Sequence, residues 1–354
     1  MRRRLLRLTG ALIFFGIFYL LFWPVSIDPV AWSPPDAPKL EGVYAVNTKL
    51  AGAERFAERI GVGPEDLAFD AKGWVYTGFE DGRIFAISPD GTQRKLLANT
   101  RGRPLGMRFD AAGDLIVADA SKGLLRIAPD GTITVLATEA EKSGFGFTNH
   151  LAIASDGTIY FSDSSTRWGA GQAIADIFEH LPTGRLMAYD PKTKTVRVLM
   201  RKLQYANGVA LASDETFVLV NETGNYRIRR YWLKGPKAGS SDIFIENLPG
   251  FPDNISANGK GTFWLALYTV RNPAADALAG KPFLRKVVWR LPQFAQPGPK
   301  PYAFVLGLDE TGKVVHNLQD PQGRYSPVTS AVEHDGMLWL GSLSAPSLAR
   351  FKAP

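Results

Sequence analysis

A five-residue pattern recurs along this chain, and it constrains the fold more than any other feature. Five copies share one register and a sixth fits it more loosely; they occupy residues 65–69, 105–109, 149–153, 207–211, 253–257 and 328–332. Their starting positions are separated by 40, 44, 58, 46 and 75 residues. A period of about 40–50 residues is typical of β-propeller blades, so the long intervals imply insertions.

Each repeat is expected to form four short strands. Segments of alternating apolar and polar residues are separated by turns that contain Asp and Gly, as at 90–91 and 130–131. This combination is a hairpin signature, and we interpret Asp70 and Asp110 as turn formers of the same kind. Four strands in each of six repeats predict an all-β fold, a six-bladed β-propeller over residues 61–354.

Insertions into the repeat are predicted at residues 164–184 and 269–326, and the second is expected to include a strand over residues 286–290. Such excursions usually lie on one face of a propeller and often cover a binding site. Trp168 and Phe178 in the first insertion therefore predict a substrate wall. Phe251 and Tyr268 complete the candidate substrate pocket.

The chain begins with a segment suited to a membrane. Residues 5–23 are apolar apart from Arg7, Thr9 and glycines, about the length that crosses a bilayer core. Arginines precede this segment, so the positive-inside rule predicts a cytoplasmic N-terminus and an exported propeller. We interpret residues 1–24 as an uncleaved signal anchor, or transmembrane helix. A cleaved signal peptide is the alternative, but no convincing cleavage site follows the apolar segment.

A linker is predicted between the anchor and the propeller, over residues 25–60. It is rich in proline and has no periodic pattern, so it is expected to be extended and to lead away from the bilayer. A short amphipathic piece at residues 51–60 is expected to be helical.

The composition limits the metals and the partners. Among 354 residues there is no cysteine, and the four histidines show no zinc-like spacing, so a metal must be held by oxygen or histidine nitrogen. The net charge is +7, and four of these charges come from arginines within the first seven residues. The other basic residues are scattered, which argues against a nucleic-acid partner. We expect a small-molecule substrate and a membrane instead.

The first column of the repeated pattern carries the chemistry; it reads Glu65, Leu105, Asn149, Asn207, Asp253 and Val328. The innermost strands of a propeller line its axis, so residues in one register converge. Two carboxylates and two carboxamides form a hard-cation site that fits Ca²⁺ best, and Asn254 can add another oxygen. The two negative charges would balance the ion, while the neutral amides would leave it Lewis-acidic.

Each of these residues also has a purely structural explanation. An Asn at the end of a strand commonly bonds to its own backbone, and Glu65 after Gly63-Pro64 fits an exposed loop. A role in turns would not require polar residues at the same position of four repeats. Their shared position therefore favours the metal site over the structural explanation. The ion itself could be only structural. His150 is a candidate acid/base group or a strand histidine with satisfied hydrogen bonds.

Four stretches resemble the strictosidine synthase-like branch of six-bladed propellers, which is related to the gluconolactonases and paraoxonases. They are residues 184–191, 206–211, 227–239 and 248–255, including Trp232-Leu233-Lys234-Gly235-Pro236 and Pro252-Asp253-Asn254. The resemblance extends over essentially everything after Pro24, and the anchored layout resembles the membrane-associated members of that branch. It implies Ca²⁺ ligands at Glu65, Asn149, Asn207 and Asp253, with Asn254 as an extra ligand.

Two departures limit what the resemblance implies. Strictosidine synthases carry a catalytic glutamate just upstream of the motif Glu333-His334-Asp335-Gly336, where this chain has Val328-Thr329-Ser330. Paraoxonases carry a histidine where this chain has Leu105. These differences argue against a Pictet–Spengler condensation and against a histidine-dyad mechanism.

The sequence therefore predicts a membrane-anchored, Ca²⁺-dependent hydrolase of lactones or aryl esters. Ca²⁺ would polarise the carbonyl, Asp253 would act as nucleophile or as base toward water, and His150 would assist. Two alternatives stay open. One is a strictosidine synthase-like enzyme that forms carbon–carbon or carbon–nitrogen bonds, and the other is a non-catalytic ligand-binding propeller in which Ca²⁺ braces the axis.

Overall fold

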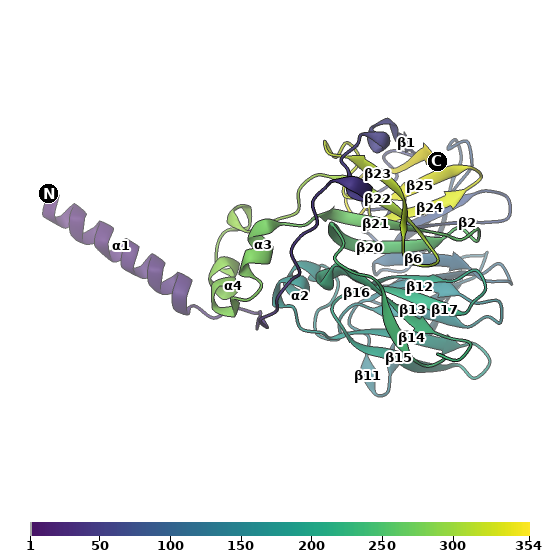
Figure 1. Cartoon of the computed structure of the whole chain (residues 1–354), viewed down its shortest axis with the longest axis horizontal. Helices are drawn as coiled ribbons and strands as arrows, with labels where there is room; N and C mark the ends of the chain where they lie inside the picture. Colours follow the sequence, from purple (N-terminus) through teal and green to yellow (C-terminus); the bar gives the residue numbers. More distant parts are fainter. Residues whose placement is uncertain (1) are drawn as a thin grey trace.

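The computed structural model describes residues 2–354 and has six four-stranded antiparallel sheets arranged as the blades of a propeller (Figure 1). The first three blades contain β2 (Leu67–Phe69), β3 (Val75–Gly78), β4 (Arg83–Ile87), β5 (Arg94–Asn99), β6 (Pro104–Phe109), β7 (Leu115–Asp119), β8 (Gly123–Ile127), β9 (Ile133–Ala137), β12 (Thr148–Ile153), β13 (Ile159–Asp163), β14 (Gly184–Asp190) and β15 (Thr195–Leu203). The predicted six-bladed all-β fold is confirmed.

The last three blades complete the ring. They contain β16 (Ala206–Leu211), β17 (Phe217–Glu222), β18 (Arg227–Trp232), β19 (Ser241–Ile245), β20 (Gly250–Ala257), β21 (Thr262–Val270), β22 (Ala303–Asp309), β23 (Val314–Asp320), β24 (Ser330–His334), β25 (Met337–Gly341), β26 (Leu348–Lys352) and β1 (Glu54–Phe56). In the sixth blade β1 pairs with β26, so the two ends of the propeller share one sheet. The predicted helix at residues 51–60 is therefore wrong: this stretch holds the 3₁₀ turn η2 (Lys49–Gly52) followed by β1.

The turn residues behave as the sequence predicts. Asp70 accepts hydrogen bonds from the backbone N–H groups of Lys72 and Trp74, both at 2.9 Å. Gly73 in the same turn has φ +76°, a conformation that favours glycine. Asp110 makes the equivalent contacts in the second blade. These local bonds hold the hairpins, and leave the interior of each blade to apolar side chains.

The core lies between neighbouring blades. Phe217 and Phe244 from the fourth blade pack against Phe263 from the fifth, with ring centroids 6.1 and 5.9 Å from the Phe263 ring. Phe56 on β1 and Trp339 on β25 pack edge-on within the sixth blade. Both belong to one buried cluster with Leu67 and Val75 of the first blade, which joins the two blades. Each large side chain buried in this way contributes about 1.5–3 kcal/mol, so the ring is held by sheet-to-sheet packing.

Helices and short turns lie outside the blade repeat. They are α1 (Arg2–Phe22), α2 (Ala173–Glu179), α3 (Pro273–Leu278), α4 (Pro282–Trp289), η1 (Gly42–Tyr44), η3 (Thr223–Asn225) and η4 (Gln293–Ala295), with a small ribbon of β10 (Glu139–Ala140) and β11 (Ser143–Gly144). The strand predicted at residues 286–290 is wrong because α4 occupies this stretch. Pro282 is preorganised for a first helical position, and this outweighs the β-branched pair Val287-Val288.

The α2 and α3–α4 insertions lie on one face of the propeller. Each connects the second and third strands of a blade, and in an antiparallel blade that connection is on the side where the innermost strand begins. We call this side the insertion face. The linker crosses it: the N–H of Trp32 donates to the Ala279 carbonyl at 3.3 Å, and Arg271 donates to the Pro35 carbonyl at 2.7 Å. The linker thus packs on the propeller, and that it leads away from a bilayer stays a prediction.

The N-terminal helix α1 is long and apolar enough to span a membrane. It makes few contacts with the rest of the molecule and extends beyond the insertion face (Figure 1).

Candidate functional site

The first residues of the repeated pattern lie where the six innermost strands begin. β-Bulges interrupt the strand pairing at this level in four blades, between residues 104 and 107, 148 and 151, 206 and 209, and 252 and 255. A bulge adds an unpaired residue and redirects side chains. Consecutive residues such as Asn149 and His150, or Asp253 and Asn254, can therefore both contribute to the axial channel.

Two carboxylates of the first column are brought together in the channel. Glu65 is 4% exposed and Asp253 is 6% exposed. Burial, and then the charge of Glu65, raise the pKa of Asp253 well above its usual value. Burial also raises the pKa of Glu65 to about 7, although the Arg103 guanidinium opposes the shift. A cation held between these groups would relieve both penalties.

The carboxamides of the column present unpaired oxygens. Asn149 donates from Nδ2 to Ser164 Oγ at 2.9 Å, and Asn207 donates from Nδ2 to Asp253 Oδ1 at 2.9 Å. Within residues 2–354, the buried oxygens Glu65 Oε2, Asn149 Oδ1, Asn207 Oδ1 and Asn254 Oδ1 have no hydrogen-bond partner. Buried polar atoms are rarely left unpaired, so this concentration calls for a missing partner.

The donor set fits Ca²⁺. The described part of the chain contains no group of three or more His, Cys, Asp or Glu side chains that could hold a metal. The column instead combines two carboxylates with amide oxygens, which suits a hard cation. Arg103 Nη2 lies 3.9 Å from Glu65 Oε2, which is too far for a hydrogen bond.

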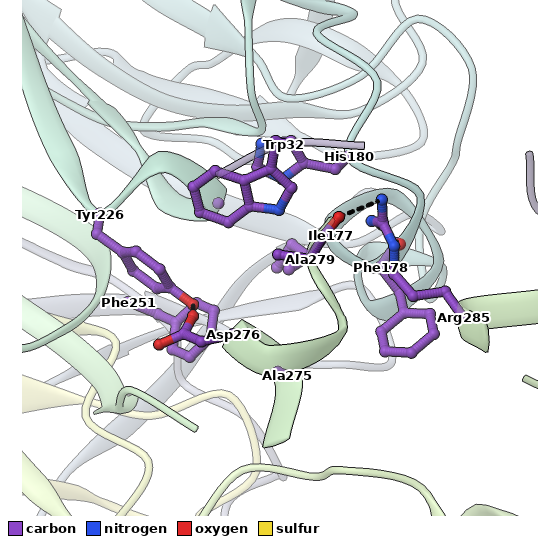
Figure 2. A pocket seen from close by; sticks show the side chains of 11 residues that line it. Trp32, Ile177, Phe178, His180, Tyr226, Phe251, Ala275, Asp276, Ala279 and Arg285 are labelled. Atoms are coloured by element: carbon purple, nitrogen blue, oxygen red, sulfur yellow. Dashed lines mark hydrogen bonds between the residues drawn. The ribbon is translucent and has the colours of Figure 1, made fainter. Parts of the chain in front are cut away.

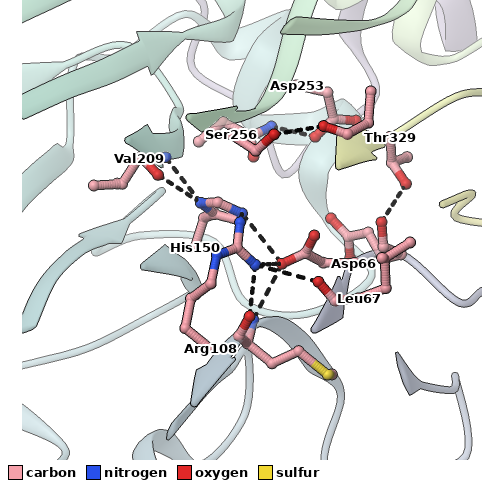
Figure 3. A network of polar contacts seen from close by, with 12 residues as sticks. Asp66, Leu67, Arg108, His150, Val209, Asp253, Ser256 and Thr329 are labelled. Carbon is pink, nitrogen blue, oxygen red and sulfur yellow. Dashed lines mark hydrogen bonds and ion pairs between the residues drawn. The ribbon is translucent and has the colours of Figure 1, made fainter. Parts of the chain in front are cut away.

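A second polar network, not predicted from the sequence, involves residues one step further along the strands (Figure 3). Asp66 Oδ2 accepts hydrogen bonds from Arg108 Nη1 at 2.7 Å and from the Met107 N–H at 3.1 Å. Burial opposes ionisation of Asp66, but Arg108 and His150 outweigh it and keep the pKa of this carboxyl well below its usual range. In the sequence, Asp66 can be recognised as a candidate because it directly follows Glu65. Nothing in the sequence indicates that Arg108 belongs to the same network.

His150 is fully buried in this network. Nδ1 lies 2.9 Å from the Val209 backbone nitrogen and 3.1 Å from the Val209 carbonyl oxygen. Nε2 lies 3.3 Å from Asp66 Oδ2 and 3.4 Å from Arg108 Nη2. Burial lowers the pKa of His150, so the ring is held neutral. Both nitrogens are in use, and the ring can orient Asp66 and the neighbouring strand.

Glycines permit the inner strands to approach closely. A Cβ on Gly106 would lie 2.6 Å from His150 Cα, and one on Gly208 would lie 2.5 Å from the Ile255 nitrogen. Neither contact is sterically possible. These two positions follow the first column directly, so the channel has room there for Asp66, His150 and Asn254 only because glycine alternates with them.

A cavity of about 40 Å³ lies under the insertions (Figure 2). Its lining comes from the linker, α2, the α3–α4 insertion and the fourth and fifth blades, and includes Trp32, Phe178, His180, Tyr226, Phe251 and Arg285. Trp32 stacks on His180 with ring centroids 4.0 Å apart, and the Tyr226 hydroxyl donates to Asp276 Oδ1 at 2.9 Å. Burial lowers the pKa of His180 to about 3, which keeps this ring neutral under Trp32.

The four predicted pocket residues have different environments. Phe178 and Phe251 line the cavity. Tyr268 on β21 is half-buried, and burial, followed by the charges of Asp253 and Glu65, raises its pKa. Trp168 is instead 8% exposed, packs with Ile27 and Ala175, and donates from its indole N–H to Glu179 Oε2 at 2.7 Å.

One further buried carboxyl belongs to α2. Asp176 is 1% exposed, and Gln204 Nε2 lies 3.4 Å from its Oδ1. Burial, followed by the charges of Glu179 and Asp163, raises the pKa of Asp176 to about 7. Burial of Tyr205, followed by the charges of Asp176, Glu65 and Asp253, raises its pKa well above the usual value. No pattern in the sequence pointed to Asp176, which lies inside an insertion.

Known proteins resemble the chain over nearly its whole length. Family models match at residues 149–236 (strictosidine synthase) and 42–87 (strictosidine synthase-like, N-terminal). The adipocyte plasma membrane-associated protein of Bos taurus is 38% identical, over 95% of this chain and 87% of that protein. Protein strictosidine synthase-like 10 of Arabidopsis thaliana is 41% identical, over 90% of this chain and 91% of that protein.

Solved structures share the fold at low sequence identity. A gluconolactonase from Xanthomonas campestris superposes with a TM-score of 0.63 at 17% identity, covering 93% of this chain and 98% of that one. Regucalcin from Agrobacterium tumefaciens, described as a calcium-binding protein, has a TM-score of 0.58 at 12% identity, covering 85% and 95%. At these identities the likeness concerns the propeller fold alone.

Proposed function

This chain belongs to the strictosidine synthase-like family of six-bladed propellers, and we propose that it is a membrane-anchored, Ca²⁺-dependent hydrolase of lactones or aryl esters. One observation carries the proposal: three buried side-chain oxygens of the column, and a fourth on the adjacent Asn254, have no hydrogen-bond partner among residues 2–354. Glu65, Asn149, Asn207, Asp253 and Asn254 would hold the ion. The gluconolactonase and calcium-binding descriptions of the structural neighbours are consistent with this chemistry.

Bound Ca²⁺ would supply a Lewis acid that polarises the carbonyl of a lactone or ester. Asp253 is the proposed nucleophile, or the base toward a water molecule. Asn207 Nδ2 donates to Asp253 Oδ1, which fixes the carboxylate and leaves Oδ2 to attack the carbonyl carbon or to take a proton from water. We assign His150 a positioning role, since its two ring nitrogens face Val209 and Asp66.

The anchor determines where this chemistry takes place. We propose that α1 spans a membrane with its N-terminus cytoplasmic, because Arg2, Arg3, Arg4 and Arg7 precede or begin the apolar segment. The propeller would then lie on the exported side, in the periplasm, the lumen or the extracellular space.

The test is hydrolysis by the full chain in detergent micelles. A panel of lactones and aryl esters is assayed with Ca²⁺, after chelation, and after Ca²⁺ is restored. Turnover that is lost on chelation and recovered with Ca²⁺ supports the proposal. An absence of turnover in a folded protein that binds Ca²⁺ would contradict it and favour a ligand-binding propeller.

The carbon–carbon bond-forming alternative is tested with the same preparation, by supplying an amine and an aldehyde. The stretch that corresponds to the catalytic glutamate of strictosidine synthases offers no carboxylate here: Val328 is buried and Thr329 Oγ1 donates to the Glu65 carbonyl at 2.8 Å. We therefore expect no condensation product.

A further inference from the structure

The end of α1 is attached to the α3–α4 insertion by a side chain that replaces a missing backbone donor. The Leu20 carbonyl would normally accept a hydrogen bond from residue 24, but residue 24 is proline and has no N–H. Arg290 supplies the donor, with Nη1 2.9 Å from the Leu20 carbonyl and Nε 2.6 Å from the Trp23 carbonyl. The start of the linker is attached to α4 by the ion pair of Lys286 with Asp28, at 2.8 Å. A membrane-spanning α1 would thus bring α4 to the bilayer surface (Figure 1).

Large apolar side chains are exposed at this place. Phe283 and Leu284 on α4 are 56% and 42% exposed, and Phe294 on η4 is 92% exposed. The opposite side of α4 is engaged in the fold, where Arg285 Nη1 donates to the Phe178 carbonyl at 2.7 Å and Trp289 stacks on Phe178. Burying one such phenylalanine would gain about 1.5–3 kcal/mol, so an apolar phase next to α4 would be favourable.

The same stretch is basic. Between Asp276 and Asp309 the sequence contains no acidic residue but includes Lys281, Arg285, Lys286, Arg290 and Lys300. Lys281 and Lys300, at the two ends of the stretch that holds these apolar side chains, are exposed. Exposed aromatic and leucine side chains next to lysines are the composition of segments that lie in the headgroup region of a bilayer.

We propose that the surface made by Lys281, Phe283, Leu284, Phe294 and Lys300 is a docking surface for an anionic lipid bilayer. We call it the α4 surface. Its apolar side chains enter the acyl boundary while its lysines meet the lipid phosphates. The inference uses the membrane anchor of the proposed function, and it adds a second contact that holds the insertion face of the propeller against the membrane.

The test uses single labels on the full chain. The natural sequence has no cysteine, so Phe283→Cys and Phe294→Cys can each carry one environment-sensitive fluorophore. Ala112→Cys is the matched control, since it lies in the exposed β6–β7 turn on the opposite face of the propeller. Each protein is reconstituted into vesicles of phosphatidylcholine and phosphatidylglycerol, with or without brominated acyl chains as quenchers. Retention after alkaline carbonate extraction reports on α1 separately.

We expect brominated lipid to quench the labels at positions 283 and 294 several-fold more than the label at 112. Quenching at these positions supports docking even if carbonate releases the chain, which would contradict only the anchor. A chain that is retained while its labels at 283 and 294 are quenched no more than the control overturns docking and leaves the anchor intact. Equal quenching at all three positions, with or without retention, also overturns it. Hydrolase activity is measured independently, so its failure would not affect either result.

Discussion

Asn207 donates a hydrogen bond to Asp253 Oδ1 at 2.9 Å, and this contact fixes the direction of both side chains. Asn207 Nδ2 also lies 3.2 Å from Thr223 Oγ1, so the amide nitrogen is identified by two partners. The amide oxygen must then point away from Asp253, into the buried space where no described residue satisfies it. Asn207 on the fourth blade thereby orients the Asp253 carboxylate of the fifth blade, and its own amide oxygen remains available to a ligand.

Asp253→Asn should preserve the fold and abolish hydrolysis. The substitution keeps the shape of the side chain but removes the proposed nucleophile or base and one of the two negative charges that would face the proposed Ca²⁺. We expect a loss of roughly 10²–10⁴-fold in kcat, measured on the best substrate of the panel. Asp242→Asn, at a half-buried surface ion pair with Arg230, is the control. Normal turnover by Asp253→Asn would remove this residue from the mechanism.

Arg108→Met should destabilise the propeller. Asp66 is completely buried, and Arg108 is its main counter-charge at 2.7 Å. Removing one partner from a buried ion pair costs about 3–5 kcal/mol, so the urea midpoint of the chain in detergent should fall markedly. Arg201→Met breaks an exposed pair with Glu141 and should cost less than about 1 kcal/mol. Equal effects of the two substitutions would show that Asp66 needs no counter-charge.

Asp176 should make the protein less stable as the pH rises. Its pKa increases from 3.8 to about 7 on folding, so the folded state holds the proton more tightly than the unfolded state. The stabilisation is complete below about pH 4 and is lost as the pH approaches 7, amounting to at most about 4 kcal/mol.

Asp176→Asn should reduce the fall in stability between pH 4 and 8 in urea unfolding, and leave the part that comes from Glu65 and Asp253, whose pKa values are also raised. Asp190→Asn is the control, because hydrogen bonds from the backbone of Lys192 and Thr193 lower the pKa of Asp190; its own contribution changes only below about pH 4, and the profile between pH 4 and 8 should stay as in the natural chain. An unchanged pH profile in Asp176→Asn would show that Asp176 is ionised in the folded protein.

Trp32→Ala should improve the hydrolysis of bulky esters. The cavity of about 40 Å³ is smaller than a lactone, and Trp32 covers it from the linker. Removing the indole should lower KM several-fold for large aryl esters and change it little for small lactones. Trp74→Ala, at a turn on the opposite face, provides the comparison. A uniform change across the substrate panel for Trp32→Ala would place the substrate elsewhere.

The repeat, the turns and the first column could be predicted because each has a local signature. The hairpin turns place Asp and Gly at fixed positions. The first column can be found because the innermost strands of the repeats can be aligned in the sequence. The Asp66 network could not be predicted in this way. It depends on bulges that redirect His150, and on Arg108, which belongs to a different column and reaches Asp66 only in three dimensions.

The long intervals between repeats predicted where the insertions lie, but not their secondary structure. Val287-Val288 favoured a strand by propensity, and only the proline at the first helical position and the packing of Arg285 and Trp289 against α2 explain the helix. Trp168 looked like part of a substrate wall because it lies outside the repeat. Its burial depends on Ile27 from the linker, a contact that no periodicity reveals.

The sheet shared by β1 and β26 also sets an order of events during synthesis. Residues 54–56 leave the ribosome long before residues 348–352, so β1 must wait for its partner until all six blades have been synthesised. During that interval β1 and β25 each have an unpaired edge, and such edges attract other strands. A chain that ends before residue 348 would keep those edges, and we expect it to aggregate or be degraded rather than form a smaller ring.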